Sequence, residues 1–377
     1  MRIAMIGTRG VPARYGGFET CVEEVGKRLV GMGHQVLVFG RSSHADRPLT
    51  HHGMRLVWLP VIPRRSLETL SHSLLSVLHP ALVGADVSFL FNAANAPVLP
   101  ALRARRIPVA THVDGLEWQR AKWGALGQRY YRGAESLSVR WSDALIADAR
   151  GIADYYRVEF GAPTRLIAYG APVLTEGHPA DRLSEVGVAP GGYHLIVARF
   201  EPENHVAELV EGYLRSTATK PLIVVGSAPY AEAYTSRVRT LADDRVRLLG
   251  SVWDSALLDQ LYAHAYSYLH GHSVGGTNPS LLRAAGAATY VIAWDVGFNR
   301  EVLGGCAAYV DTPTAAAGAI EAAERDPDST ASSARAGQAA MARYDWDDVA
   351  REYERLAQDL RHRRLPLSRA SGRRRST

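Results

Sequence analysis

The sequence predicts an α/β protein built from two domains, each a doubly wound, mainly parallel β-sheet flanked by helices. Three observations lead to this prediction. Short apolar runs alternate with helix-like stretches, the alternation restarts at residue 193, and a chain of 377 residues is longer than one domain usually is.

Six short runs in the first half predict buried parallel strands. Each is rich in aliphatic or aromatic residues and is bounded by Gly, Pro or Asp, which is typical of strands covered on both faces. The runs are residues 2–6, 35–40, 54–60, 86–92, 107–113 and 144–148. The segments between them have room for helices, so residues 1–170 are predicted to form a Rossmann-like domain.

The second half repeats this pattern. Its predicted strands are residues 193–200, 221–226, 246–250, 266–271 and 289–295, which places a second Rossmann-like domain at 193–343. Residues 171–192 are rich in Pro, Gly and polar side chains and predict a linker. Residues 344–364 predict a closing helix that packs back on the first domain, and the basic tail 365–377 is expected to be disordered.

Composition excludes several classes of protein. Cys21 and Cys306 are the two cysteines and lie far apart, which argues against a disulfide framework and a zinc site and fits a reducing cytoplasm. No apolar run reaches the roughly 18 residues of a membrane span, and the opening strand pattern predicts no signal peptide. The net charge of +5 depends on the seven arginines of residues 361–377, so no nucleic-acid partner is expected. No metal site is predicted.

A glycine-rich stretch, GTRGVPARYGGFET, follows the first predicted strand. Its glycines lack the G-x-G-x-x-G spacing of a dinucleotide site, although Arg41 after the second strand leaves an NADP-dependent reductase as one alternative. Gly16 and Gly17 directly precede a predicted helix, where backbone N–H groups would bind an anion. A second alternative is a turn without a ligand, in which Glu19 satisfies the helix dipole.

Four stretches together resemble a known family: residues 2–20, 114–124, 198–205 and 270–286. They are similar to the retaining glycosyltransferases of GT-B fold, family 4, and to a rhamnosyltransferase-like branch with YGGFE and DGLEW motifs. The resemblance covers nearly the whole chain. It implies two Rossmann-like domains around a cleft, an N-terminal acceptor domain and a C-terminal nucleotide-sugar domain.

This resemblance also implies an activity. The chain would move a hexose or deoxyhexose, rhamnose-like, from a nucleoside diphosphate sugar to a saccharide or lipid-linked acceptor with retention, as in polysaccharide biosynthesis. The nucleotide sugar is a co-substrate, and no further cofactor is implied. The protein would be cytoplasmic, and the basic tail would allow a peripheral contact with anionic lipids.

Besides the Gly16–Gly17 loop, donor diphosphate binding falls on two stretches of the second half. Arg199 matches the family's diphosphate-binding arginine, and Asn204 stands where a lysine is usual. The second stretch supplies a helix start for the diphosphate through Gly275, Gly276, Thr277 and Asn278. On the nucleotide side, Arg283 replaces a glutamate that would accept hydrogen bonds from the ribose, which an arginine cannot do.

Arg283 leaves three explanations open. It binds a phosphate of a different donor, it is tolerated at reduced activity, or the chain has lost catalysis and acts as a binding subunit of a glycan pathway.

The stretch THVDGLEW supplies the acceptor-side candidates. Asp114 and Glu117 would orient or deprotonate a sugar hydroxyl. His112 is a further catalytic candidate, because the resemblance implies a histidine here that contacts the donor sugar. It lies one residue before the family's usual position, so its side chain would point to the other face of the strand, and a packed histidine is the alternative. Trp118 and Trp123 would stack on sugars or belong to the core.

Overall fold

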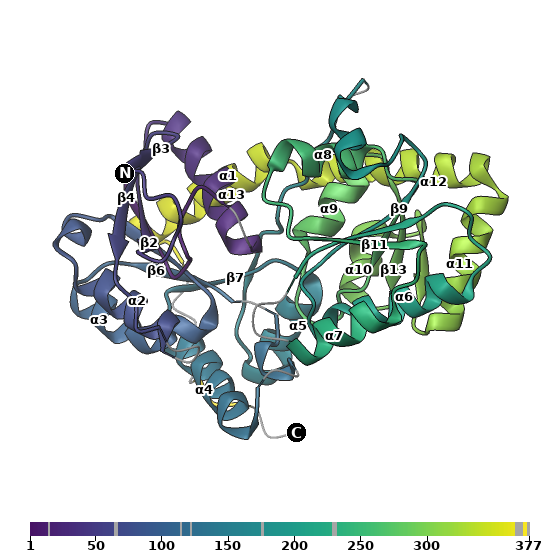
Figure 1. Cartoon of the computed structure of the whole chain (residues 1–377). Helices are drawn as coiled ribbons and strands as arrows, with labels where there is room; N and C mark the ends of the chain where they lie inside the picture. The colour runs from purple at the N-terminus through teal and green to yellow at the C-terminus, as the bar shows by residue number, and fades with distance from the viewer. Residues whose placement is uncertain are drawn as a thin grey trace. The chain divides into compact units, whose positions relative to one another are not determined.

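The chain forms two compact units, each defined by the contacts among its own residues. The computed structural model describes residues 1–13, 16–63, 67–113, 115–120, 123–174, 177–227, 232–365 and 372–374. The first unit joins Met1–Tyr169 to Trp346–Thr377, and the second is Gly170–Asp345 (Figure 1). The first unit therefore contains both ends of the chain.

The first unit is built on a sheet of eight strands in the order β3-β4-β2-β1-β5-β6-β7-β8. All neighbours are parallel except the hairpin β3–β4. The strands are β1 (Arg2–Ile6), β2 (Gln35–Arg41), β3 (Thr50–His51), β4 (Met54–Leu59), β5 (Val87–Phe91), β6 (Val109–His112), β7 (Ala144–Ala147) and β8 (Arg165–Leu166). The six predicted strands are present, and β3 and β8 are additional edge strands of two residues each.

Helices flank this sheet. The α-helices are α1 (Gly17–Gly31), α2 (Glu68–Leu78), α3 (Leu99–Ala104), α4 (Ala125–Trp141), α5 (Arg150–Phe160) and α13 (Trp346–Arg361). Short 3-10 turns lie at η1 (Pro80–Leu82), η2 (Ala93–Val98) and η3 (Glu117–Gln119). The core lies where β1, β2, β5 and β6 meet η2, α3 and α4, and strands β1 and β5 are buried over nearly their whole length.

The closing helix α13 belongs to the first unit. Its buried residues recur at helical spacing, so one apolar face packs against the unit while acidic and basic residues face solvent. Tyr353 on this helix is fully buried, and its ring packs edge-on against Phe89 of β5 at 5.0 Å. Helix α13 lies beside α1, at the left of Figure 1.

The second unit contains a parallel sheet of six strands in the order β11-β10-β9-β12-β13-β14. They are β9 (His194–Val197), β10 (Leu222–Val225), β11 (Val246–Gly250), β12 (Ser267–His270), β13 (Tyr290–Trp294) and β14 (Ala307–Val310). The five predicted strands are present, whereas β14 was missed because its sequence, AAYV, is half alanine. The helices are α6 (Val206–Arg215), α7 (Glu232–Leu241), α8 (Ser255–Ala263), α9 (Pro279–Gly286), α10 (Gly297–Leu303), α11 (Pro313–Arg325) and α12 (Pro327–Ala340), with 3-10 turns η4 (Asp181–Val186), η5 (Pro202–Asn204) and η6 (Met341–Tyr344).

Part of the predicted linker 171–192 is folded into the second unit. Turn η4 lies within it, Leu183 is 1% exposed, and the Arg182 N–H donates to Gln260 of α8 at 2.9 Å. The polar composition of this segment reflects its position at the surface of the unit.

The basic tail also differs from its expected disorder at residues 372–374. Arg374 forms ion pairs with Glu135 (2.6 Å) and Glu159 (3.0 Å) and donates to the Tyr155 hydroxyl at 2.9 Å. Glu135 is 5% exposed in its side chain, so a buried carboxylate attracts the arginine. Burial raises the pKa of Glu135, and Tyr155 and Arg374 oppose that shift.

Candidate functional site

The strand order of the second unit marks a place where ligands bind in α/β sheets. From β9 the chain adds β10 and β11 on one side, then returns to place β12 against the other side of β9. Such a switch point leaves a crevice outside the carboxyl ends of the two neighbouring strands. Arg199 and Asn204 lie after β9, and residues 275–278 lie after β12. The predicted donor residues of the second unit therefore come together at one switch point, whereas Gly16 and Gly17 belong to the first unit.

Asn204 connects the two loops at this switch point. Its side-chain amide donates to the Arg199 carbonyl at 2.8 Å, and its Oδ1 lies 2.9 Å from Nδ1 of His272. Asn204 is 5% exposed. One N–H and the oxygen of the amide are thus used within the protein, which favours a positioning role for Asn204 over its predicted contact with a diphosphate.

Two further bonds join the same loops. The Ser273 N–H donates to the Glu203 carbonyl at 2.9 Å, and the Ser273 hydroxyl lies 2.9 Å from Nε2 of His205. The imidazole of His205 stacks on Trp294 of β13, with ring centroids 3.9 Å apart and planes within 6°. The β9 and β12 loops therefore behave as one connected surface.

Gly275 allows a close approach to His272. Its φ is +147°, and a Cβ built there would lie 2.7 Å from Nε2 of His272. An alanine would consequently displace the imidazole or the loop. Sequence reasoning missed His272, although its place after β12 at a switch point was a usable signal.

Helix α9 begins immediately after this loop. Asn278 is the N-cap, and its Oδ1 accepts from the Ser280 N–H at 2.9 Å, while Pro279 occupies the first helical turn. Gly276 and Thr277 are buried beside it. The cap satisfies one N–H of the first turn, so Asn278 serves the helix start and does not itself need to contact a ligand.

Arg199 supplies positive charge at this switch point. Its side chain is 35% exposed, and Nη1 lies 3.5 Å from Oε2 of Glu201. At that distance the carboxylate moderates the charge of the guanidinium without a short bidentate contact. A half-exposed arginine beside a helix start is chemically suited to an anion.

Arg283 on α9 is bound to helix α8. Its Nε donates to Oδ1 of Asp259 at 2.8 Å, Nη2 lies 2.5 Å from the same oxygen, and the guanidinium lies over the Tyr262 ring at 5.2 Å. The structure therefore shows an internal ion pair at the position predicted to face the nucleotide.

The first unit has its own switch point, between β1 and β5. Asn95 lies there, 0% exposed; its amide donates to the Phe91 carbonyl at 2.7 Å and its Oδ1 accepts from Ser73 at 2.6 Å. Gly7, after β1, has φ +106° and lies so close that a Cβ would be 2.6 Å from Nδ2 of Asn95. Sequence reasoning missed this buried amide.

The Gly16–Gly17 corner lies at the start of α1. Gly16 has φ +104°, Gly17 is the first helical residue, and Glu19 is buried in the first turn. One oxygen of Glu19 accepts from the Arg9 N–H at 2.9 Å, and the other lies beside the Cα of Gly16. A carboxylate already faces this helix start, which fits the alternative in which Glu19 satisfies the dipole.

His112 is a packed histidine. It is 1% exposed on β6, its Nδ1 lies 3.0 Å from the Tyr353 hydroxyl, and its ring contacts Phe18 with centroids 5.1 Å apart. Burial lowers its pKa to about 3, so the ring is neutral at physiological pH. These contacts favour the packed-histidine alternative over the prediction of a catalytic residue.

Glu117 is engaged by its neighbours in the chain. Its Oε2 lies 2.5 Å from Nε of Arg120, and its Oε1 accepts from the indole N–H of Trp123 at 3.2 Å. The carboxylate is 8% exposed, so it is not placed to receive a proton from an acceptor. Asp114, the other acceptor-side candidate, lies outside the described residues.

The two tryptophans of this stretch pack on helix α4. Arg132 lies over the Trp118 ring at 5.2 Å, and Trp123 contacts Tyr131 with ring centroids 5.0 Å apart. Both tryptophans are half-buried, and these contacts favour packing within the first unit over a free surface for stacking on sugars.

Arg41 is unsuited to a nucleotide phosphate. It is 6% exposed, with Nη1 3.1 Å from Oε1 of Glu68 and Nη2 donating to Thr69 at 3.1 Å. The reductase alternative rested on this side chain being available, and the structure does not support it.

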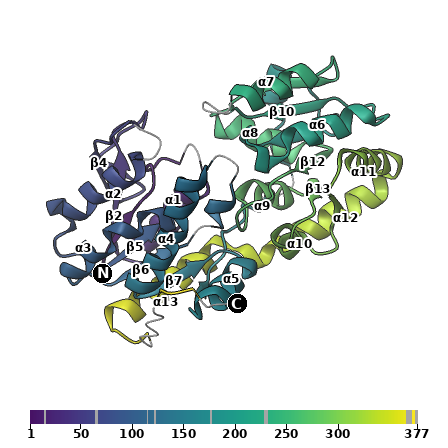
Figure 2. The ribbon, with the colours of Figure 1, turned by 90° about the horizontal axis from the view of Figure 1, so that it is seen from below.

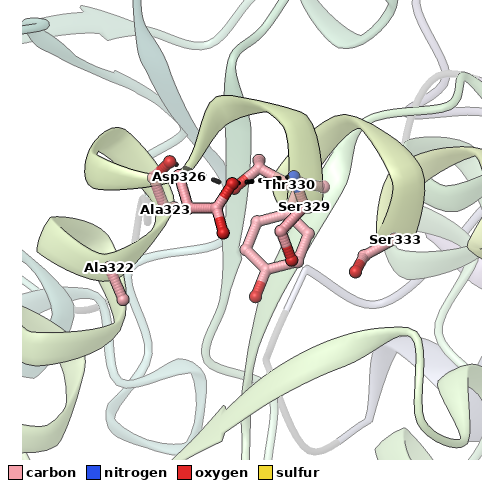
Figure 3. Close-up of a pocket in the computed structure, with 7 residues that line it drawn as sticks. Ala322, Ala323, Asp326, Ser329, Thr330 and Ser333 are labelled. Carbon is pink, nitrogen blue, oxygen red and sulfur yellow. Dashed lines mark hydrogen bonds between the residues drawn. The ribbon is translucent and has the colours of Figure 1, made fainter.

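Other features of the described residues lie apart from these switch points. Glu23, His51 and His52 bring one carboxylate and two imidazoles within reach of a single metal ion. A hollow of about 210 Å³ between α11 and α12 is lined by Tyr290, at the amino end of β13, and by Asp326, which caps α12 (Figure 3). It therefore lies at the opposite end of the sheet from the donor candidates.

Among the described helices, none is both long and apolar enough to span a membrane.

Comparisons with known proteins agree with this geometry. Residues 16–170 match a family model described as a glycosyl transferase 4-like domain, and residues 192–326 match glycosyl transferases group 1. A comparison with curated protein sequences finds no significant match.

Several solved structures resemble the chain over nearly their full lengths. Sucrose-phosphate synthase from Thermosynechococcus elongatus gives a TM-score of 0.82 at 21% identity, covering 95% of this chain and 98% of that one. Anabaena HepE in complex with UDP-glucose gives 0.77 at 19%, covering 95% and 100%. A UDP-forming α,α-trehalose-phosphate synthase from Burkholderia xenovorans, in complex with glucose-6-phosphate, gives 0.72 at 13%, covering 95% and 100%. These likenesses confirm the predicted fold class, GT-B.

Proposed function

The chain belongs to the GT-B glycosyltransferases, and we propose that it transfers a hexose or deoxyhexose from a nucleoside diphosphate sugar to a saccharide or lipid-linked hydroxyl. The proposal includes retention of the anomeric configuration, a rhamnose-like donor, a role in polysaccharide assembly and a cytoplasmic setting. HepE was solved with UDP and with UDP-glucose, and the trehalose-phosphate synthase with a sugar phosphate. Those ligands motivate the same ligand classes for this chain.

The observation that carries the proposal is the joined pair of loops at the β9–β12 switch point. Breaking a glycosidic bond to a diphosphate increases negative charge on the leaving group, and a fixed cation and peptide dipoles would stabilise that charge. Arg199 is the cation, and the first turn of α9 supplies the dipoles. Asn204 and His272 hold the two loops in register.

A binding experiment tests the donor part of this proposal. Calorimetry with UDP, dTDP and NADPH should give heat with a nucleoside diphosphate and none with NADPH. Replacing Arg199 with Ala should weaken nucleoside diphosphate binding by about tenfold or more, because a charge-assisted contact contributes about 1.5–3 kcal/mol. Arg215 of α6 is a matched control, since it is exposed and already paired with Glu211 at 2.5 Å. Equal binding by both variants would contradict the proposed site.

A transfer experiment tests the reaction. A panel of nucleotide sugars with saccharide and lipid-linked acceptors should give one product whose anomeric configuration, read by NMR, matches that of the donor sugar. Inversion would exclude the retaining reaction while leaving donor binding intact.

A second candidate is a catalytically impaired binding subunit, which the Arg283–Asp259 ion pair favours. Arg283→Glu alone would set two carboxylates against each other, so the informative variant is the charge exchange Arg283→Glu with Asp259→Arg. If the natural chain is impaired, the exchange should raise transfer above wild type; if Arg283 serves a working site, the exchange should lower it. Thermal unfolding of the same variant checks that the pair has re-formed.

A further inference from the structure

Helix α2 has the reverse of the usual polarity. Its buried positions are His72, Ser73, Ser76 and Val77, three of which are polar. Its outward positions are leucines, namely Leu67 (39% exposed), Leu74 (48%), Leu75 (39%) and Leu78 (55%). A helix on the surface of a soluble unit normally turns its apolar stripe inward. Here the four leucines, which we call the leucine face, point away from the unit.

The inner face is polar because it packs on the carboxyl end of β2 and on turn η2, which follows β5. Ser73 donates to Asn95 at 2.6 Å, whereas the Ser76 hydroxyl is satisfied within the helix by the His72 carbonyl at 2.8 Å. Arg41, at the end of β2, reaches Glu68 at the start of the helix. These buried partners fix the rotation of α2, so the leucines cannot turn inward without breaking the hydrogen bonds.

The leucine face extends beyond the helix. Val83, just after η1, is 66% exposed and follows the same end of α2 as Leu78. Single exposed apolar residues are ordinary, whereas a group of them on one stripe indicates an interaction surface.

Positive charge borders this surface. Helix α3 lies beside α2 in both Figure 1 and Figure 2, and Arg105 and Arg106 follow its last turn. The Arg105 guanidinium donates to the Leu78 carbonyl at 3.1 Å, which places the cation against the end of the leucine face. Both arginines are exposed, and neither pairs with a carboxylate in the part of the chain that the structure describes.

We propose that the leucine face docks on an anionic lipid surface, with the leucines at the acyl boundary and Arg105 and Arg106 at the headgroups. Exposed leucines beside unneutralised arginines are the composition that interfacial helices use. A second copy of the chain fits less well, because two-fold contact through this face would oppose the same arginines across it. The inference goes beyond the proposed transfer reaction and needs neither donor nor catalysis.

Flotation of the full-length protein with vesicles tests this proposal. Vesicles of phosphatidylglycerol and phosphatidylcholine in equal parts should bind the protein, and vesicles of phosphatidylcholine alone should bind it much less. The double variant Leu74→Gln, Leu78→Gln should lower the partition coefficient by about tenfold or more, because two interfacial leucines are lost. Arg105→Gln should lower it by about fivefold on anionic vesicles.

Two exposed residues elsewhere in the first unit provide matched controls. Leu126 is 82% exposed at the start of α4, and Val158 is 53% exposed on α5, so Leu126→Gln and Val158→Gln remove apolar surface without touching α2. Both should bind vesicles as wild type does. The Leu74, Leu78 variant should also keep wild-type thermal unfolding and nucleotide binding, since its changes lie at exposed positions. That readout separates failure of this proposal from failure of the proposed function.

Three results would overturn the proposal. The first is that wild type does not float with anionic vesicles. The second is that the leucine variant floats as well as wild type. The third is that light scattering shows a dimer that the leucine variant abolishes. In the second case binding would belong to another part of the chain such as the basic tail, and in the third the occupant would be a second copy.

Discussion

Replacing Asn204 with Ala is the sharpest test of the joined loops. The variant loses the bond to the Arg199 carbonyl (2.8 Å) and the contact with Nδ1 of His272 (2.9 Å), at a residue that is 5% exposed. Each lost bond contributes about 1 kcal/mol, and a buried polar group left unsatisfied costs more, which gives about 2–4 kcal/mol of destabilisation in the second unit.

Two measurements check this value. Hydrogen exchange of peptides covering 199–205 and 270–278 resolves the second unit from the first, so the result does not depend on two-state unfolding of the whole chain. Calorimetry with a nucleoside diphosphate should show binding weakened by about tenfold, because the loops lose their register.

Asn204→Asp provides the comparison. The aspartate still accepts from His272 but cannot donate to the Arg199 carbonyl, so it should fall between wild type and Asn204→Ala. If Asn204→Ala keeps wild-type exchange in both loops and a stability within about 0.5 kcal/mol, the amide does not join them and the reasoning fails.

The remaining predictions concern buried charges and protons. Burial lowers the pKa of His270 to about 3 from an ordinary 6.5, so the unfolded chain takes up that proton first. Its contribution to stability is therefore present above pH 6.5 and falls as the pH is lowered toward 3; urea unfolding between pH 7 and 5 should show this slope, and His270→Asn should reduce it. Glu117→Gln should cost about 1–2 kcal/mol by breaking the contact with Arg120, with no change in the pH profile of transfer, whereas loss of one limb of that profile would restore Glu117 as a catalytic base. Arg374→Gln should destabilise the first unit by about 1–3 kcal/mol, because Glu135 loses its counter-charge; an unchanged melting temperature would show that the tail contact is not maintained in solution.

Local sequence pattern was sufficient for most of the fold. The buried strands β1, β5 and β9 are mainly apolar runs with clear boundaries, which is why their positions could be predicted. Strands β3 and β8 consist of two residues each and have no detectable period. Their formation depends on a neighbouring edge, which is tertiary information.

In the candidate site, the positions of the loops could be predicted from the sequence, whereas the partners of single side chains could not. The loops were placed correctly because parallel strands expose their carboxyl ends at one edge of a sheet. The partners of Asn204 and Arg283 could not be predicted, since His272 and Asp259 lie 68 and 24 positions away. The ion pair of Glu117 could have been predicted, because Arg120 follows it by three positions and this spacing indicates a local ion pair.

The chain order gives the closing helix a consequence for biosynthesis. The ribosome releases β1 first, yet the partner that covers this part of the first unit, α13, emerges only after all of residues 170–345. Until then Cys21 lacks the Tyr353 hydroxyl that lies 3.6 Å from its sulfur, and His34 lacks Glu354 at 2.8 Å. The second unit, which is contiguous in sequence, can finish folding while the nascent first unit still exposes the surface that α13 later covers. A chain that ends just before residue 346 would therefore contain every residue of the second unit but would lack the helix that completes the first.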